Sequence, residues 1–225
     1  MVTGLAFDVA HLLAGGMVVV SFMLLYQDRM FALLHVFALH AGLLAAAVAW
    51  QAAVQHAPHL FVTAAIALLF KAIFIPVALR RIMIRLGIHR EIEQVVATGV
   101  MMLAGLGLTA LAILVTLPVT AGTDVLTRED VAFALAILLL GLLMMITRRN
   151  AVSQVIGFMS LENGLILAAA GAKGMPLVVE LSVAFSVLIA FIVFGMFFFR
   201  IRERFDTLDL QYLENFRGDR GQDRP

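Results

Sequence analysis

Two carboxylates, Glu162 and Glu180, lie inside long apolar runs of the sequence. An ionised side chain surrounded by hydrocarbon costs on the order of 3 kcal/mol by insertion scales, so each of them needs a physical reason. A titratable group in such a position can take up and release a proton, or it can be held by an opposite charge. The chemistry that these residues could perform is therefore proton transfer or the formation of a buried ion pair.

Lys71 is the expected partner of Glu162. It lies eight residues before Leu79, where its own apolar run ends, and Glu162 lies eight residues after Gln154, where the sixth run begins. If both ends are on the same side of the membrane, both charges lie about 12 Å deep, given the rise per residue of a helix. Equal depth and opposite charge predict a pair. Two roles stay open for this pair: a structural ion pair that holds two helices together, and a proton relay through water.

Other polar residues in these runs are candidate helpers. Asn163 and Ser160 flank Glu162 and can hydrogen-bond to it or to another helix. Pro76 removes a backbone donor and predicts a kink near Lys71 where water can enter, although a packing role is equally open. Glu180, three residues inside its run, is either a relay exit or an interfacial carboxylate at a helix N-terminus.

The histidines do not predict a metal site. His35 and His40 are five residues apart, which is not the i, i+4 spacing of a helical metal pair, and no carboxylate accompanies them. We expect proton carriage, with His35 as a relay candidate, or helix-to-helix hydrogen bonds. The sequence contains no Cys, which excludes thiolate-held iron–sulfur clusters. It also contains no nucleophile triad and no phosphate loop. We therefore expect no catalytic residue, metal or cofactor in this chain.

The composition predicts an all-α membrane protein. Of 225 residues, 63% are hydrophobic and 14% charged, and the mean hydropathy is +1.03. In lipid only helices and closed barrels give every backbone amide a partner, and these runs are too continuously apolar for barrel strands. About seven runs approach the length of about 20 residues that spans a bilayer. They are Gly4 to Leu25, Phe31 to Trp50, Leu60 to Leu79, Val95 to Leu117, Val131 to Thr147, Gln154 to Ala172 and Leu177 to Phe199.

The distribution of Lys and Arg predicts the orientation, because cytoplasmic loops are enriched in both. With seven spans, the side of the N-terminus carries only Arg128 and Lys173, and the other side carries thirteen Lys or Arg residues, with Lys71 inside a span. We expect the N-terminus outside and the C-terminus in the cytoplasm. The sequence divides into a five-helix region, 1–147, a two-helix region, 148–200, and a cytoplasmic tail, 201–225. The net charge of +1, without a basic patch, argues against a nucleic-acid partner.

Three stretches carry a family resemblance. They are FKAIFIPVAL around Lys71, the block from RRN at 148–150 through QVIGFMSLENG to PLVVEL at 176–181, and DTLDLQYLENFRG in the tail. Together they resemble component E of hydrogenase-4, a membrane subunit of formate hydrogenlyase-type complexes. The second half, with 131–147 as its first helix, is similar to the K subunit of complex I and the C subunit of multisubunit antiporters. Matched on Asn163, Glu162 lies three positions after the glutamate of the K subunit. Ser186 stands where component E has an acid.

The resemblance implies a multi-pass subunit of a prokaryotic inner-membrane complex related to complex I. Its partners would be a large antiporter-like subunit and the anchor of a hydrogenase arm, beside the lipid bilayer. Glu162, Lys71 and also Glu180 and His35 would then carry protons along the middle of the membrane. Two alternatives stay open: a subunit of a multisubunit cation/proton antiporter, and a purely structural scaffold.

Overall fold

The computed structural model of the chain describes residues 2–85, 95–119 and 125–171. This part is helical and contains no strand. The α-helices are α1 (Val2–Tyr26), α2 (Met30–Gln55), α3 (Pro58–Ile66), α4 (Ile75–Arg85), α5 (Thr98–Val119), α6 (Val125–Thr147) and α7 (Ala151–Gly171), and a π-helix, η1 (Ala67–Phe74), joins α3 to α4.

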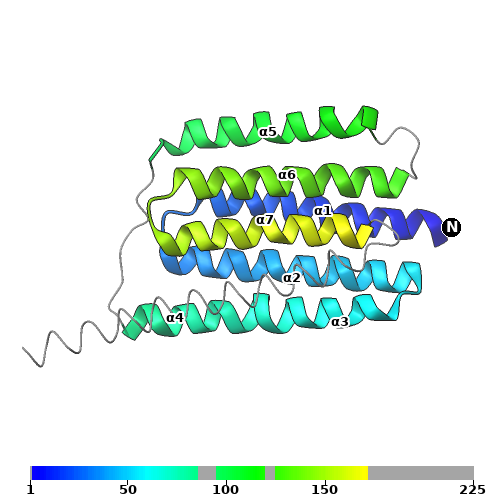
Figure 1. Ribbon diagram of the computed structural model, residues 1–225, viewed down its shortest axis with the longest axis horizontal. Helices are drawn as coiled ribbons and strands as arrows, with labels where there is room; N and C mark the ends of the chain where they lie inside the picture. The colour runs from blue at the N-terminus through cyan, green and yellow to red at the C-terminus, as the bar shows by residue number, and fades with distance from the viewer. Residues whose placement is uncertain (1, 86–94, 120–124, 172–225) are drawn as a thin grey trace, which may run out of the picture. The chain divides into compact units, whose positions relative to one another are not determined.

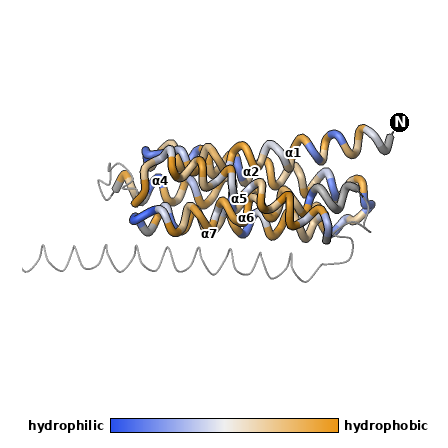
Figure 2. Tube along the Cα trace, turned by 90° about the horizontal axis from the view of Figure 1, so that it is seen from above, coloured by the Kyte–Doolittle hydropathy of each residue, from blue (hydrophilic) through white to orange (hydrophobic). Residues whose placement is uncertain are grey.

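Six helical segments of this part are long and apolar enough to cross a membrane, with α3, η1 and α4 forming one of them. They coincide with the first six expected runs, which confirms an all-helical, multi-pass architecture for this part of the chain. Hydrophilic colours gather toward the helix ends in Figure 2. The seventh expected span and the tail lie outside the described residues.

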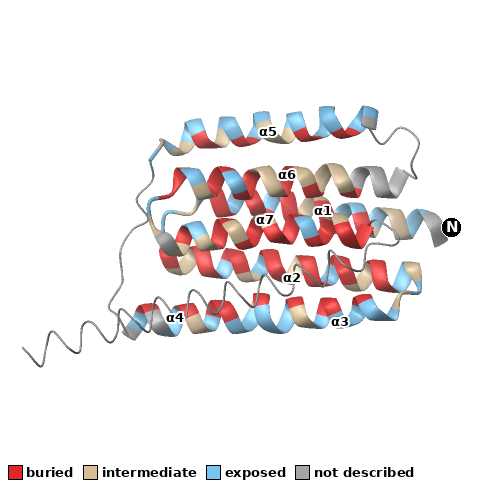
Figure 3. Cartoon of the chain, in the orientation of Figure 1, coloured by how far each residue is buried: buried red, intermediate tan, exposed pale blue. Residues whose placement is uncertain are grey.

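Helices α1, α2, α6 and α7 pack against one another, with α5 against α6 and α1 on one side and α3–η1–α4 against α2 on the other (Figure 1). Figure 3 shows the buried residues on the facing sides of these helices, and exposed residues along α5 and along α3 and α4. The exposed residues of α5 and η1 include large apolar side chains, such as Leu103, Leu114 and Phe70. Such surfaces suit contact with lipid.

Several helix boundaries differ from the sequence-based expectation, and two of these differences concern polar residues of the bundle. Helix α6 begins at Val125 rather than Val131, and α2 continues to Gln55 rather than ending near Trp50. His56 ends α2 in a left-handed conformation, and its N–H donates to the carbonyl of Ala52. Both differences arise because polar residues near a helix end can stay helical when residues of other helices form hydrogen bonds with their side chains. These extensions place Gln51 and Asp130 inside the bundle.

Glycines bring α6 and α7 into close contact. A Cβ atom on Gly141 would lie 2.6 Å from the amide nitrogen of Leu161, and one on Gly164 would lie 2.8 Å from the carbonyl oxygen of Ala134. The two backbones can approach this closely only because glycine has no side chain, as is common between membrane helices. The contact fixes the position of α7 around Glu162 and Asn163.

Candidate functional site

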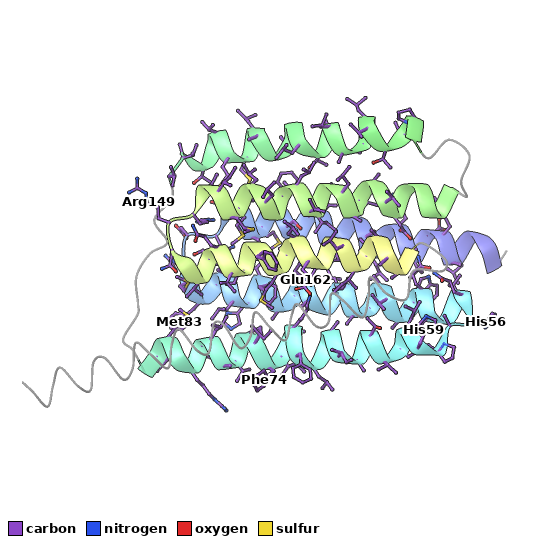
Figure 4. The ribbon with its side chains drawn as sticks, viewed as in Figure 1. His56, His59, Phe74, Met83, Arg149 and Glu162 are labelled. Carbon is purple, nitrogen blue, oxygen red and sulfur yellow. The ribbon has the colours of Figure 1, made fainter. Side chains whose placement is uncertain are left out.

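The centre of the site is a buried ion pair. The ammonium nitrogen of Lys71 lies 3.1 Å from Oε2 of Glu162, and the two side chains are 3% and 4% exposed. Figure 4 shows Glu162 midway along α7, with Arg149 at one end of the bundle and His56 and His59 at the other. The pairing expected from equal depth is therefore confirmed. The long Lys71 side chain makes this contact from η1, which packs on α2.

A chain of hydrogen bonds continues from this pair. Lys71 donates to Oδ1 of Asn163 at 2.9 Å, and the Asn163 amide nitrogen lies 3.0 Å from Nδ1 of His40. The other ring nitrogen of His40, Nε2, lies 3.0 Å from the Ser21 hydroxyl, which donates to the carbonyl of Met17 at 2.9 Å. The chain thus connects η1, α7, α2 and α1, and all four polar side chains are buried. Asn163 makes the helix-to-helix bonds expected of it.

Lys71 lies in the middle of the π-helical segment. Its neighbours Leu69, Phe70 and Ile73 are exposed, whereas Lys71 itself is buried. At the end of this segment the Ile75 N–H donates to the carbonyl of Phe70, five residues back. A π-helical turn changes the direction in which a side chain points, and such turns are frequent at functional sites. Pro76, which is buried and lacks an N–H, lies two residues after the end of this segment, in the first turn of α4. The kink and the entry of water near it stay a prediction.

The other predicted site residues have different positions. Ser160 is buried on α7, but His35 is on the exposed side of α2. The buried histidine that joins the polar chain is His40, five residues later. Glu180 lies outside the described residues. The described residues contain no group of three or more His, Cys, Asp or Glu side chains placed to hold a metal ion.

A second polar cluster, which the sequence analysis missed, lies nearer the other end of the bundle. Gln51 donates to Oδ2 of the buried Asp130 at 2.8 Å, and Gln55 donates to Gln51 and to the carbonyl of Ala170. The signal was present as two glutamines four residues apart at the end of an apolar run and an acid at the start of another. The predicted runs end at Trp50 and begin at Val131, so these three polar residues fall just outside them.

Apolar residues separate the two clusters. Asp130 lies against Gly171, nine residues after Glu162 on α7, which corresponds to about 14 Å along the helix. Between these levels, α7 contributes the buried Ile166 and Leu167, and α2 contributes Leu44 and Val48. The carboxylate at each level is thus surrounded by its own polar partners, with hydrocarbon between the levels.

Arg148 forms a third buried polar site, at the end of the bundle where α1 ends and α7 begins. It is 1% exposed, and one of its terminal nitrogens, Nη2, donates to the carbonyls of Leu25 at 2.6 Å and Leu24 at 3.4 Å. These carbonyls belong to the last turn of α1, where no intrahelical donor follows. Burial lowers the pKa of the Arg148 guanidinium, and the nearby Asp28 carboxylate raises it.

Comparison with known proteins gives a relative but no described function. No protein-family model matches the sequence, and no solved structure matches it. The sequence is 32% identical over 206 residues to a Mycobacterium tuberculosis protein named "Uncharacterized protein Rv0085", and the match covers 91% of this chain and 94% of that protein. The chain therefore belongs to the same protein family as Rv0085 of Mycobacterium tuberculosis.

Proposed function

We propose that the chain is a membrane subunit of a hydrogenase-4 or formate hydrogenlyase-like complex related to complex I. In this role it contributes to proton translocation and to the assembly of the membrane arm. It carries no redox centre, and other subunits transfer the electrons. Its partners are a large antiporter-like subunit and the anchor of the hydrogenase arm.

The observation that carries the proposal is the polar chain around Lys71 and Glu162. Two opposite charges with hydrogen-bonding partners lie in the middle of a mostly apolar bundle, and Lys71 lies on a π-helix. Titratable residues inside membrane helices are rare and commonly belong to proton paths. The stretches that resemble hydrogenase-4 component E include Lys71 with Pro76 and Glu162 with Asn163.

The proposed topology has seven spans in a prokaryotic inner membrane, with the N-terminus outside and the C-terminus in the cytoplasm. The α1–α2 and α6–α7 connections and the C-terminal end of α4 lie at one end of the bundle in Figure 1. These segments include Arg29, Arg80, Arg81, Arg148 and Arg149. The gathering of positive charge at one end supports a cytoplasmic position for it.

A scaffold role is the second candidate, and one observation favours it. Lys71 contacts both Glu162 and Asn163, so that a direct ion pair joins α7 to the α3–η1–α4 segment. Such a pair can hold two helices in register without moving any proton. The two functions differ in what happens when the charges are removed together.

The test uses the intact complex, purified in mild detergent and reconstituted into liposomes. A co-purifying nickel–iron and iron–sulfur arm supports a hydrogenase-type complex, and antiporter subunits alone would contradict it. Proton uptake per electron pair is then compared for wild type, Glu162→Gln, and the neutral double variant Lys71→Met with Glu162→Gln. The matched control is Asp8→Asn, which changes an exposed carboxylate of α1.

A proton relay predicts that the double variant assembles and turns over but loses coupled proton movement. A scaffold predicts normal coupling in any variant that assembles. The double variant is the informative one, because neither charge is left buried without its partner.

A further inference from the structure

We propose that His40 is a second proton-carrying residue of this site, and that the Asn163 amide makes protonation of His40 and of Lys71 mutually exclusive. The inference rests on the proposed proton translocation, and it concerns residues that lie between Lys71 and α1. It follows from which atoms in the hydrogen-bonded chain can donate and which can accept.

The Asn163 amide has two different ends. Its oxygen, Oδ1, only accepts and faces the ammonium of Lys71, and its nitrogen, Nδ2, only donates and faces Nδ1 of His40. Nδ1 must therefore accept, which places the proton of a neutral imidazole on Nε2. From there it is donated to the Ser21 hydroxyl, whose own proton goes to the Met17 carbonyl. In this arrangement both ring nitrogens of His40 and both ends of the Asn163 amide have a hydrogen-bonding partner.

Protonation of His40 breaks the arrangement. A doubly protonated imidazole has an N–H at Nδ1, and this N–H would point at the N–H groups of Asn163. The conflict is removed if the amide turns over, so that Oδ1 faces His40 and Nδ2 faces Lys71. A charged ammonium has no lone pair and cannot accept from Nδ2, whereas a neutral amine can. The positive charge can therefore reside on either side of Asn163, but not on both sides with the hydrogen bonds intact.

Because His40 and Lys71 are not protonated together, a proton that reaches His40 displaces one from Lys71. The Asn163 amide itself carries no proton. A proton arrives at Nδ1 of His40 and forms an N–H bond there. The amide turns over, an N–H bond of Lys71 breaks, and that proton forms an O–H bond with Oε2 of Glu162, 3.1 Å away. The site then holds one additional proton, with His40 charged and Lys71 and Glu162 neutral. Release of the Glu162 proton toward the other side leaves His40 charged and Lys71 neutral. A water molecule bridging Nδ1 of His40 and the amine nitrogen of Lys71 then takes the Nδ1 proton and gives one to Lys71, which restores the starting state.

The charged groups around His40 are few within the described part of the chain. The Lys71 ammonium is bound to the other end of the Asn163 amide, and Glu162 is the ion-pair partner of Lys71. From α1 the contact is the uncharged Ser21, and Asp130 of α6 lies at the level of Gly171, away from this site. The Lys71 charge is thus the main electrostatic influence on His40, and Asn163 is its hydrogen-bonded link.

The test reads the ring nitrogens directly, by nitrogen-15 NMR of the histidine-labelled full-length chain in lipid nanodiscs. The signals of His40 are identified by their loss in His40→Gln, with His35→Gln as the control on the exposed side of the same helix. In the wild type at neutral pH we expect a proton on Nε2 and none on Nδ1. A proton on Nδ1 in that sample would overturn the proposal.

A second measurement distinguishes the effect of the Asn163 amide on the protonation of His40 from the effect of charge repulsion by Lys71. Replacing Lys71 by Met together with Glu162 by Gln frees the amide, and we expect the ratio of doubly to singly protonated His40 at a fixed acidic pH to rise at least tenfold. The same pair of substitutions is then made in an Asn163→Leu background. The amide switch predicts that most of the rise disappears there, whereas repulsion alone predicts that it persists. A persistent rise, or none in either background, contradicts the proposal.

This experiment is independent of proton pumping. If the coupling between Lys71 and His40 is absent while the neutral double variant abolishes pumping, the switch is wrong and the proposed function stands. If the coupling is present and pumping survives, the proposed function is wrong.

Discussion

The ammonium of Lys71 and the carboxylate of Glu162 lie 3.1 Å apart, and both are almost completely removed from solvent. The two residues are separated by more than ninety positions in the sequence, so the contact depends on the packing of the whole bundle. Burying two charges costs several kcal/mol for each ion, which only close pairing and further hydrogen bonds offset. Asn163 supplies one of these bonds through Lys71.

We expect each single neutralisation, Lys71→Met or Glu162→Gln, to lower the free energy of unfolding by about 3–5 kcal/mol, because it leaves the other charge buried alone. The double neutral variant should recover most of this loss. The measurement is reversible unfolding in mixed micelles. Equal losses in the single and double variants would show that the charges are not coupled.

We also expect Pro76→Ala to weaken the ion pair. The substitution provides an N–H that can donate to the carbonyl of Ala72 and favours an ordinary α-helix in place of the π-helical segment. Rewinding would turn Lys71 away from Glu162 and Asn163. The loss of unfolding free energy should be larger in the wild-type background than in the neutral double variant, and the difference between the backgrounds measures the coupling.

The control for this experiment is Pro118→Ala. Pro118 lies in the last turn of α5, exposed and away from the polar chain. Its replacement should cost the same in both backgrounds. If Pro76→Ala also costs the same in both, the π-helix does not position Lys71.

Much of the fold could be predicted from the sequence because the spans are long and apolar. Six of the expected runs coincide with helices, and the pairing of Lys71 with Glu162 followed from depth and charge alone. Depth along a helix can be counted in residues. It therefore needs no knowledge of which helices are neighbours.

The sequence predicted less well which side of a helix a residue faces. His35 and His40 lie on the same apolar run, and only the packing of α2 against α1 and α7 shows that His40 is the buried one. Likewise, the π-helical turn around Lys71 changes the direction of side chains without any local sequence signal beyond Pro76. Asp130 and Gln51 looked like loop residues because their partners come from distant helices.

The Asp130 cluster gives a further prediction. Gln51→Leu removes the donor to a buried carboxylate oxygen, and we expect it to lower the free energy of unfolding by about 1–3 kcal/mol. Asp8→Asn, at an exposed carboxylate on α1, should change it by less than about 0.5 kcal/mol. Thermal unfolding in detergent compares the two. An unchanged melting temperature for Gln51→Leu would show that other groups satisfy Asp130.

The close contact of α6 and α7 predicts a strong effect of one methyl group. In Gly141→Ala the new Cβ would lie 2.6 Å from the Leu161 amide nitrogen, so the helices must move apart, at a cost of about 1–3 kcal/mol. Gly42→Ala on α2 is the matched control, because nothing lies within 4 Å of its Cβ position. Both are measured by unfolding in mixed micelles. Equal stability of the two variants would contradict the close contact.

The two adjacent arginines at 148 and 149 provide the last test. Arg148 is buried and donates to the carbonyls of Leu24 and Leu25 at the end of α1, whereas Arg149 is exposed. Arg148→Met removes the donor from both carbonyls, and we expect it to lower the free energy of unfolding by about 1–3 kcal/mol. Arg149→Met removes the same charge from an exposed position, so the free energy should change by less than about 0.5 kcal/mol.

Arg148→Lys distinguishes the hydrogen bonds of Arg148 from its charge. Lysine keeps the positive charge, but its side chain is shorter and its ammonium would not lie where Nη2 donates to both carbonyls, so we expect a loss between those of the wild type and Arg148→Met. Amide hydrogen exchange at the C-terminal end of α1 and the start of α2 should increase in the same order. If Arg148→Lys is as stable as the wild type, the charge beside Asp28 matters rather than the hydrogen bonds. If Arg148→Met and Arg149→Met are equally stable, Arg148 does not hold the end of α1.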